Sequence, residues 1–394
     1  MDQLVEIRPS AVAVERHRVA VICSYTISLA NFRLKLLKAM VDNGHEVVAF
    51  GPERHGPTIA ALSEIGVDFV PIPMARAGLN PLQDARTLVA LWARLRKTAP
   101  DVVLCYTMKP IIYGLIAARL AGIEDRHALV TGLGYLFSED ARGMRLSAMR
   151  ALATRLYRVA LGGDGRVFVY NEADSQDMRA GRMVEDLSRI VPVPGSGVDF
   201  DHFPSVSVPA GDPVFLLVAR LLRNKGIAEF ADAAGRLRAR HPNARFQILG
   251  RFDPGPLAVA RRDIDRWVAE GAIEYLGETD DVRPFLAAST VFVLPSYYRE
   301  GIPRSILEAM ATGRAVVTAD TPGCRDTVID GENGFIVPPR DPDALAVAME
   351  RFIEDPLLSW QMGRRSLEIA RARFDVEAVN RLLLKEMGLL APAA

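Results

Sequence analysis

The sequence predicts an α/β protein with two doubly wound domains, each built around a parallel sheet. From residue 18 onward, short apolar runs alternate with amphipathic segments of helical period, the pattern of parallel strands joined by crossover helices. The alternation stops between residues 192 and 213, where prolines and glycines gather, and then starts again. At 394 residues the chain also exceeds the usual ~150 residues of one domain. We expect the two sheets to face each other across a cleft.

The first domain is predicted to begin with a buried strand, because the run that starts at Arg18 is apolar and too short for a buried helix. Six similar runs follow, and the segments between them carry apolar residues at helical spacing. The predicted strands are 18–24, 46–50, 68–72, 102–106, 128–131, 166–170 and 189–193. The predicted helices are 31–43, 58–65, 82–97, 112–120, 140–161 and 172–179.

The second domain repeats this alternation, with helices between its strands. Its predicted strands are 214–219, 245–249, 273–276, 291–294, 315–318 and 335–337. After Pro339 the pattern is wholly helical, with predicted helices at 342–354, 357–373 and 376–390. We therefore predict domains at 16–203 and 204–375, and a C-terminal helix in 376–394 that packs across both.

The composition argues against several classes of protein. Lys and Arg total 48, as do Asp and Glu, so no net charge favours a nucleic-acid partner. The three widely separated cysteines argue against a disulfide framework and fit a reducing cytoplasm. No run approaches the ~20 apolar residues that span a bilayer, and the N-terminal residues lack the pattern of a secretion signal. We expect a cytoplasmic protein that is soluble or attached to a membrane surface.

Two cations open the second domain at the end of its first strand. Arg220 ends the strand, and Lys225 precedes a helix that begins near Gly226. Ligands of parallel sheets bind beyond the carboxyl ends of the strands. An Arg fork and a Lys point charge together suit a diphosphate. An exposed basic turn remains the alternative.

The stretch from Ser296 to Glu308 is predicted to be a loop that enters a helix directly after a buried strand. The free amides at such a helix start form an anion site. If the helix starts near Pro303, then Glu300 lies in the loop and Glu308 lies in the second turn, so both carboxylates can face one crevice. The alternative is that Glu300 is an N-terminal helix charge favoured by the helix dipole and that Glu308 is a solvated helix carboxylate.

Candidate acceptor contacts follow three strands of the first domain. The turn after the first strand, which runs to Arg33, lacks the glycines of a dinucleotide fingerprint, and its Ser28 and Asn31 can cap a helix or contact a polar substrate. Lys109 follows the fourth strand and is a candidate phosphate partner. Gly132 follows the fifth strand and either allows close approach to a ligand or satisfies a tight turn.

A basic amphipathic segment follows the fifth strand. Its apolar residues alternate with five arginines, which are Arg142, Arg145, Arg150, Arg155 and Arg158. Such a helix can lie on an anionic membrane surface, and a core-facing helix with a solvated basic face is the alternative. The segment Asp199-Phe-Asp201 imitates a metal motif, but it lies in the predicted linker, so we expect no metal there.

Several motifs together resemble the retaining family 4 glycosyltransferases. The segment Glu300-Gly-Ile-Pro-Arg-Ser-Ile-Leu-Glu308 is similar to the Glu-x7-Glu motif of that family. Arg220 with Lys225, and the segments Ser-Gly-Val-Asp199, Thr321-Pro-Gly-Cys and Asp330-Gly-Glu-Asn-Gly-Phe335, also match its pattern. The resemblance covers nearly the whole chain and implies a GT-B fold, in which two Rossmann-like domains face each other across a cleft.

The resemblance also implies roles for individual residues. The second domain would bind a nucleotide-sugar donor and the first domain the acceptor, without a metal or another cofactor. The implied catalytic residues are Glu300, Arg220 and Lys225. The implied donor-binding residues are Arg220, Lys225, Glu300, Gly301, Ile302 and Glu308, of which Glu308 would bind the ribose hydroxyls. The candidate acceptor-binding residues are Ser28, Asn31, Arg33, Lys109 and Gly132.

Within the family, the segments at Tyr106, Thr131 and Tyr297 look most like enzymes that extend undecaprenyl-diphosphate-linked sugars in bacterial polysaccharide assembly. This implies transfer of a hexose or N-acetylhexosamine from a UDP-sugar, rather than a GDP-sugar, to a lipid-linked sugar at the inner face of the cytoplasmic membrane. The chain departs from the family at Thr26-Ile-Ser28 and around Met108, so no catalytic His is assigned. A nucleotide-sugar epimerase and a non-catalytic sugar-binding regulator remain alternatives, and the sugar, the linkage and the oligomeric state stay open.

Overall fold

The computed structural model describes residues 15–75, 78, 80–137, 143–253, 255 and 257–390. The first sheet has seven strands in the order β3-β2-β1-β4-β5-β6-β7. Its strands are β1 (Arg18–Ile22), β2 (Glu46–Gly51), β3 (Asp68–Pro71), β4 (Val102–Tyr106), β5 (Asp125–Val130), β6 (Val167–Val169) and β7 (Ile190–Pro192). All seven predicted strands of the first domain are confirmed, although β5 begins earlier than predicted.

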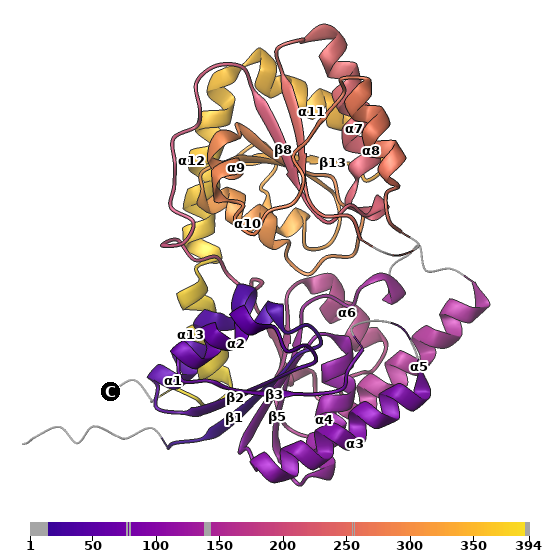
Figure 1. Cartoon of the computed structure of the whole chain (residues 1–394), viewed down its shortest axis with the longest axis vertical. Coiled ribbons are helices and arrows are strands. Elements are labelled where there is room, and N and C mark those ends of the chain that lie inside the picture. Colours follow the sequence, from indigo (N-terminus) through magenta and orange to yellow (C-terminus); the bar gives the residue numbers. More distant parts are fainter. Residues whose placement is uncertain are drawn as a thin grey trace, which may run out of the picture. The chain divides into compact units, whose positions relative to one another are not determined.

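The helices of this half follow the predicted pattern. They are α1 (Leu34–Asp42), α2 (Gly56–Glu64), α3 (Pro81–Thr98), α4 (Leu115–Leu120), α5 (Met144–Ala160) and α6 (Glu172–Ala180). The predicted start of α5 at residues 140–142 lies outside the described residues. Figure 1 shows α1 and α2 on one side of the first sheet and α3 and α4 on the other, which is the doubly wound arrangement.

The second sheet has six strands in the order β10-β9-β8-β11-β12-β13. They are β8 (Val214–Val218), β9 (Arg245–Leu249), β10 (Glu274–Tyr275), β11 (Val291–Leu294), β12 (Ala315–Ala319) and β13 (Gly334–Val337). The helices are α7 (Ile227–Arg240), α8 (Arg261–Ala269), α9 (Arg283–Ala288), α10 (Arg304–Ala311), α11 (Pro342–Glu354), α12 (Pro356–Arg373) and α13 (Val376–Glu386). Figure 1 shows α7, α8 and α11 on one side of this sheet and α9, α10 and α12 on the other.

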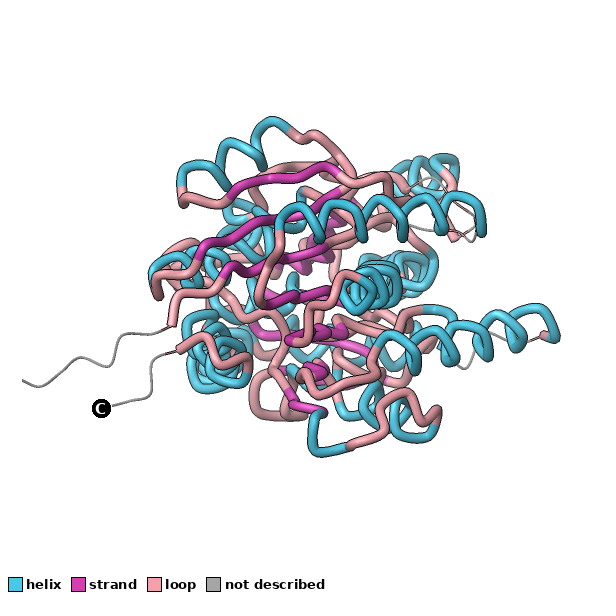
Figure 2. Tube along the Cα trace, turned by 90° about the horizontal axis from the view of Figure 1, so that it is seen from below, coloured by secondary structure: helices cyan, strands magenta, loops and turns pink. Residues whose placement is uncertain are grey.

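The central strands are largely apolar because helices cover both faces of each sheet, and Figure 2 shows strands lying between helices. Every residue of β4, β11 and β12 is buried. In the second sheet the rings of Phe215 and Phe246 stack with their centroids 5.1 Å apart, and the ring of Phe230 meets Phe246 edge-on. These side chains form the apolar layer between β8, β9 and α7.

Short π-helical turns precede two helices of the first half, where the sequence predicts ordinary helix. The turn η1 (Leu29–Arg33) precedes α1, and η2 (Pro110–Gly114) precedes α4. A wider turn of five residues carries the same apolar pattern as an α-turn, so periodicity cannot distinguish them. Pro303 was expected in the first turn of a helix, but it is the residue before α10, with extended backbone.

The predicted linker is tied to the second half of the chain by backbone contacts. Val198 pairs with Asp375, and a side chain at Gly197 would meet the Cα of Val376 at 2.6 Å. The Asp199 carboxylate accepts hydrogen bonds from the amides of residues 201 and 202 at 3.0 and 3.3 Å, so it closes a turn. The fully buried Arg314 donates to the carbonyl of Ser207 at 3.3 Å.

The chain forms two compact units. One comprises Met1–Leu129, Val159–Val167 and Asn380–Ala394, and the other comprises Val130–Arg158 and Phe168–Val379. The second unit therefore holds the whole second sheet together with the turn after β5 and helix α6. The predicted domain bounds at 16–203, 204–375 and 376–394 stay a prediction.

Candidate active site

The second sheet reverses its winding direction between β8 and β11, which are neighbours in the sheet but not in the sequence. In open parallel sheets, ligands bind outside the carboxyl ends of the strands at such a point. The connection after β8 carries Arg220 and Lys225, and the loop after β11 carries Glu300. The fold thus places the three predicted catalytic residues at the expected binding edge of this sheet.

Lys225 and Glu300 form an ion pair across this point. Each side chain is only 13% exposed, so the pair is largely shielded from water. The Glu300 carboxylate also accepts a hydrogen bond from the Ser296 hydroxyl at 3.0 Å. The Lys225 ammonium lies 5.2 Å from the centroid of the Tyr298 ring, within cation–π range. Two predicted catalytic groups therefore compensate each other's charge.

The loops that carry this pair are joined by their backbones. The carbonyl of Asn224 accepts hydrogen bonds from the amides of Tyr297 and Tyr298 at 3.0 and 2.9 Å. Gly226 has φ of 75°, and a Cβ there would lie 2.3 Å from the carbonyl oxygen of Pro295. Because no side chain fits at that position, the two loops can approach closely only with glycine here.

A third loop, after β12, completes this edge of the sheet. The Thr321 hydroxyl donates to the carbonyl of Ser296 at 2.9 Å. Gly323 has φ of 81°, and a Cβ there would lie 1.6 Å from the carbonyl oxygen of Gly301. The Thr321-Pro-Gly-Cys motif therefore packs against the backbone of the Glu300 loop.

Glu308 lies in the second turn of α10, as predicted, and its carboxylate pairs with Arg304 one turn earlier at 2.9 Å. Burial raises the pKa of the Glu308 carboxyl above its ordinary value of 4.5, and the charge and hydrogen bond of Arg304 oppose this rise. The low exposure of both side chains contradicts the alternative of a solvated helix carboxylate.

Arg220 pairs with Asp253, which follows β9 at the same edge of the sheet, at 2.7 Å. The Arg220 side chain is 38% exposed, so its guanidinium stays accessible to an anion. Asp253 was not among the predicted site residues. The position of Asp253 beyond the end of a strand could have marked it as a site residue, but the sequence does not show that β9 lies beside β8.

Gly301 and Ile302 are buried by the loops around them. A Cβ at Gly301 would lie 2.3 Å from the carbonyl oxygen of Thr131, and Ile302 packs against Gly195. Gly132 has φ of 125°, and a Cβ there would lie 3.0 Å from the amide nitrogen of Gly301. Gly132, which was predicted on the acceptor side, thus allows close approach to the donor-side loop.

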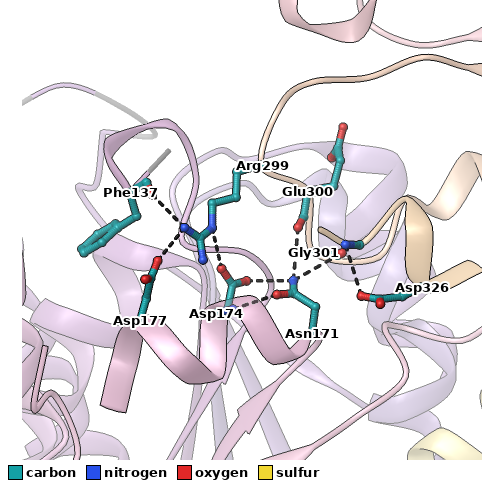
Figure 3. Close-up of polar contacts among 9 residues, drawn as sticks. Phe137, Asn171, Asp174, Asp177, Arg299, Glu300, Gly301 and Asp326 are labelled. Atoms are coloured by element: carbon teal, nitrogen blue, oxygen red, sulfur yellow. Dashed lines mark hydrogen bonds and ion pairs between the residues drawn. The ribbon is translucent and has the colours of Figure 1, made fainter. Parts of the chain in front are cut away.

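A polar cluster surrounds Arg299, and the sequence did not predict it (Figure 3). Arg299 contacts Asp174, Asp177 and the carbonyl of Phe137, and Asn171 donates to the carbonyl of Glu300. In the sequence, Asn171 and Asp174 are recognisable only as the start of a helix, because Arg299 and Glu300, which they contact, lie far along the chain.

The first sheet also changes direction, between β1 and β4, and the predicted acceptor residues other than Gly132 follow these two strands. The hydroxyls of Ser28 and Tyr106 are hydrogen-bonded at 2.7 Å, and the Arg33 guanidinium lies 5.1 Å from the centroid of the Tyr106 ring. Ser28 and Arg33 are buried, whereas Asn31 is exposed. Asn31 is therefore the member of this group that a substrate can reach directly.

Lys109 is engaged by a carboxylate that was not predicted. Its ammonium pairs with Asp84 of α3 at 2.8 Å, and the two side chains are 11% and 9% exposed. Thr107, just before it, has φ of 68°, and its hydroxyl is hydrogen-bonded to Ser24 at 2.8 Å. A β-branched residue in this region is strained, and such strain is held at sites where the surroundings fix it.

The arginines of α5 have two different environments. Arg150 donates to the carbonyl of Leu136 at 2.8 Å, and Arg158 donates to the carbonyls of Gly181 and Arg182, so these two are used by the fold. Arg145 and Arg155 are exposed. Membrane contact by this basic helix stays a prediction, and Arg142 lies outside the described residues.

Within the described part of the chain, no helix is both long and apolar enough to cross a bilayer. The same residues contain no group of three or more His, Cys, Asp or Glu side chains placed to hold a metal ion.

Two family models match the two halves of the chain. Glycosyl transferases group 1 matches residues 212–355, which include the second sheet and the Lys225–Glu300 pair. Glycosyl transferase 4-like domain matches residues 29–195. The chain is a glycosyltransferase. The resemblance inferred from the Glu-x7-Glu motif is confirmed at this level.

Solved structures confirm the GT-B fold of this glycosyltransferase. Sucrose-phosphate synthase from Thermosynechococcus elongatus aligns with a TM-score of 0.75 at 21% identity, covering 94% of this chain and 98% of that one. HepE of Anabaena, in a crystal structure in complex with UDP, aligns with a TM-score of 0.74 at 18% identity, covering 95% of this chain and all (100%) of HepE.

Curated relatives of the glycosyltransferase include enzymes with lipid-linked substrates. N,N'-diacetylbacillosaminyl-diphospho-undecaprenol alpha-1,3-N-acetylgalactosaminyltransferase of Campylobacter jejuni is 26% identical over 91% of this chain and 95% of its own length. UDP-Gal:alpha-D-GlcNAc-diphosphoundecaprenol alpha-1,3-galactosyltransferase of Escherichia coli is 27% identical over 73% of this chain and 75% of its own length.

Proposed function

We propose that this glycosyltransferase transfers a hexose or N-acetylhexosamine from a UDP-sugar to a polyprenyl-diphosphate-linked sugar, with retention of the anomeric configuration. The reaction would serve bacterial polysaccharide or glycan assembly at the inner face of the cytoplasmic membrane. The observation that carries the proposal is the Lys225–Glu300 pair at the reversal point of the second sheet, within a glycosyltransferase fold.

The donor proposal rests on the chemistry at this edge. A diphosphate needs cations, and the accessible Arg220 fork and the Lys225 ammonium supply them. Glu308 accepts hydrogen bonds from the two ribose hydroxyls. The carboxylate of Glu300 and the amides of Gly301 and Ile302 hold the sugar and phosphates. That HepE has been solved in complex with UDP supports a uridine nucleotide.

The proposed mechanism is mainly electrostatic. As the bond between sugar and diphosphate breaks, negative charge grows on the departing diphosphate. Lys225 and Arg220 balance this charge, and Glu300 keeps the sugar in place beside them. These two cations serve as the charge-balancing groups, so the proposal needs no metal or other cofactor.

The acceptor proposal rests on the names of the relatives and on the first sheet. Both relatives described above act, by name, on undecaprenol-diphosphate-linked sugars. The exposed Asn31 would contact the acceptor sugar directly. Ser28 and Arg33 would support the site through Tyr106, Lys109 would attract the acceptor phosphates in competition with Asp84, and Gly132 would leave room beside Gly301.

The proposed membrane contact is made by the outward face of α5. Met144 is 91% exposed and Leu152 is 52% exposed, and helical spacing puts them on the same face as Arg145 and Arg155. No carboxylate occurs in Met144–Ala160. A face of exposed apolar residues and exposed arginines fits the interface of an anionic bilayer.

Labelled donors test the proposal. Purified protein is incubated with UDP-hexoses, UDP-N-acetylhexosamines and their GDP counterparts, with and without polyprenyl-diphosphate-linked sugars. Label that enters the lipid phase only with acceptor supports the transfer, and proton NMR of the product then gives the anomeric configuration. Conversion of the donor without acceptor would indicate an epimerase. Binding without conversion would indicate a regulator.

A further inference from the structure

Arg299 precedes Glu300 in the loop after β11 and holds this loop from one side. Its Nε donates to the Asp174 carboxylate at 3.0 Å, and its Nη1 donates to the carbonyl of Phe137 at 2.7 Å. The same Nη1 lies 2.5 Å from a carboxylate oxygen of Asp177. The Arg299 side chain is 12% exposed and that of Asp174 is 0% exposed. One guanidinium thus ties the loop to α6 and to the turn after β5.

Asn171 fixes the loop from the other side. Its side-chain amide donates to the carbonyl of Glu300 at 3.2 Å and to the Asp174 carboxylate at 3.0 Å. Its side-chain oxygen accepts from the amide of Asp174 at 2.8 Å, which caps α6. Asp174 therefore connects the two supports at the N-terminal end of α6.

The Glu300 carboxylate points away from this cluster (Figure 3). The backbone of residue 300 is held by Asn171, and the carboxylate meets Lys225. Burial raises the pKa of Asp174, and the charge of Arg299 opposes the rise. Without Arg299, Asp174 would be a buried carboxylate that has lost its cation.

We propose that Arg299, through Asp174, is a positioning residue that orients Glu300 toward the donor sugar. Arg299 does not touch the donor itself. The inference rests on the proposed function, in which Glu300 holds the donor sugar, and adds Arg299 as a residue that supports this role. Only a planar fork reaches the two carboxylates and the carbonyl together, because a lysine offers a single charged point.

Arg299→Lys tests the inference, because the charge is kept while the fork is lost. Arg365→Lys is the matched control, since Arg365 pairs with Glu332 at 3.0 Å on an exposed surface. The first measurement is hydrogen exchange of the amides in residues 296–303, which needs no substrate. The second is steady-state turnover with the donor sugar, and the third is the affinity for UDP, which lacks the sugar. Asp174→Asn is a second variant in case Arg299→Lys folds poorly.

We expect faster exchange in 296–303 and a kcat lower by roughly 10- to 100-fold, since misplacement of a reacting group by about 1 Å costs this much. UDP affinity should change by a smaller factor than kcat, because Arg220 and Lys225 are unchanged and only the amides of Gly301 and Ile302 lie in the loosened loop. Exchange and kcat equal to wild type would overturn the inference, as would a joint loss of UDP affinity and thermal stability in both variants. A wild-type protein inactive with every donor would refute the proposed function instead, while the exchange measurement would still decide whether Arg299 holds the loop.

Discussion

Replacing Glu300 with Gln should change UDP affinity and turnover in opposite directions. In the structure Lys225 is paired with Glu300, so an incoming diphosphate must compete with that carboxylate for the ammonium. Removing the charge releases Lys225 for the diphosphate. The same change removes the group proposed to hold the sugar. We therefore expect tighter UDP binding and slower transfer.

The geometry sets the size of the effect. Both side chains are 13% exposed, so the interaction energy of the Lys225–Glu300 pair should exceed the ~0–1 kcal/mol of an exposed ion pair. It should remain below the ~4 kcal/mol of two charges 4 Å apart at an effective dielectric of about 20. A coupling of about 1–2 kcal/mol corresponds to a Kd for UDP that is lower by roughly 5- to 30-fold. Loss of an electrostatic contact at the reacting centre should lower kcat by roughly 100- to 1,000-fold.

Isothermal titration with UDP and initial rates at saturating donor measure the two effects. Glu332→Gln is the control, because it breaks an exposed pair with Arg365. An unchanged or weaker affinity for UDP in Glu300→Gln would refute the competition for Lys225. Wild-type turnover in that variant would refute the role of the carboxylate at the sugar.

Three further predictions concern other parts of the site. Glu308→Ala should raise the donor KM strongly at an unchanged melting temperature. Donor binding by the wild type needs the ionised Glu308 carboxylate, so its affinity should fall as the pH drops through the pKa of this group, which is raised above 4.5. Glu308→Gln should lack this pH dependence. Arg145→Gln with Arg155→Gln should reduce sedimentation with anionic vesicles. The control Arg262→Gln, at an exposed arginine of α8, should not, and equal binding by all variants would return α5 to a purely structural role. Gly226→Ala should destabilise the fold by about 1–3 kcal/mol in urea unfolding, because a Cβ would lie 2.3 Å from a carbonyl at a φ of 75°, and a stability equal to wild type would contradict the tight loop packing.

The strands and most helices were predictable because parallel strands buried on both faces are largely apolar. The run at Val291–Leu294 is an example: its four residues are all buried. Boundaries were less predictable where conformation depends on local sterics. Pro303 fits a first helical turn, but its ψ of 115° leaves it just outside α10. The π-helical turns carry no period of their own within five residues.

The pairing of the site residues was harder to predict from the sequence than their location. Lys225 and Glu300 could each be placed beyond a strand end, but only the strand order puts β8 beside β11. Asp84 was indistinguishable from an ordinary first-turn carboxylate, although it neutralises Lys109. Arg299 gave no local signal at all, because each of its partners lies in a distant segment of the sequence.

In the proposed function, the site at Lys225 and Glu300 transfers a sugar to a lipid-linked acceptor. The most direct measurement is the rate at which label from a UDP-sugar enters a polyprenyl-diphosphate-linked acceptor, for wild type and for Lys225→Gln. We predict acceptor-dependent labelling of the lipid by the wild type and a rate lower by roughly 100-fold or more in the variant. Labelling at equal rates by both proteins, or release of free sugar without any lipid product, would contradict the claim.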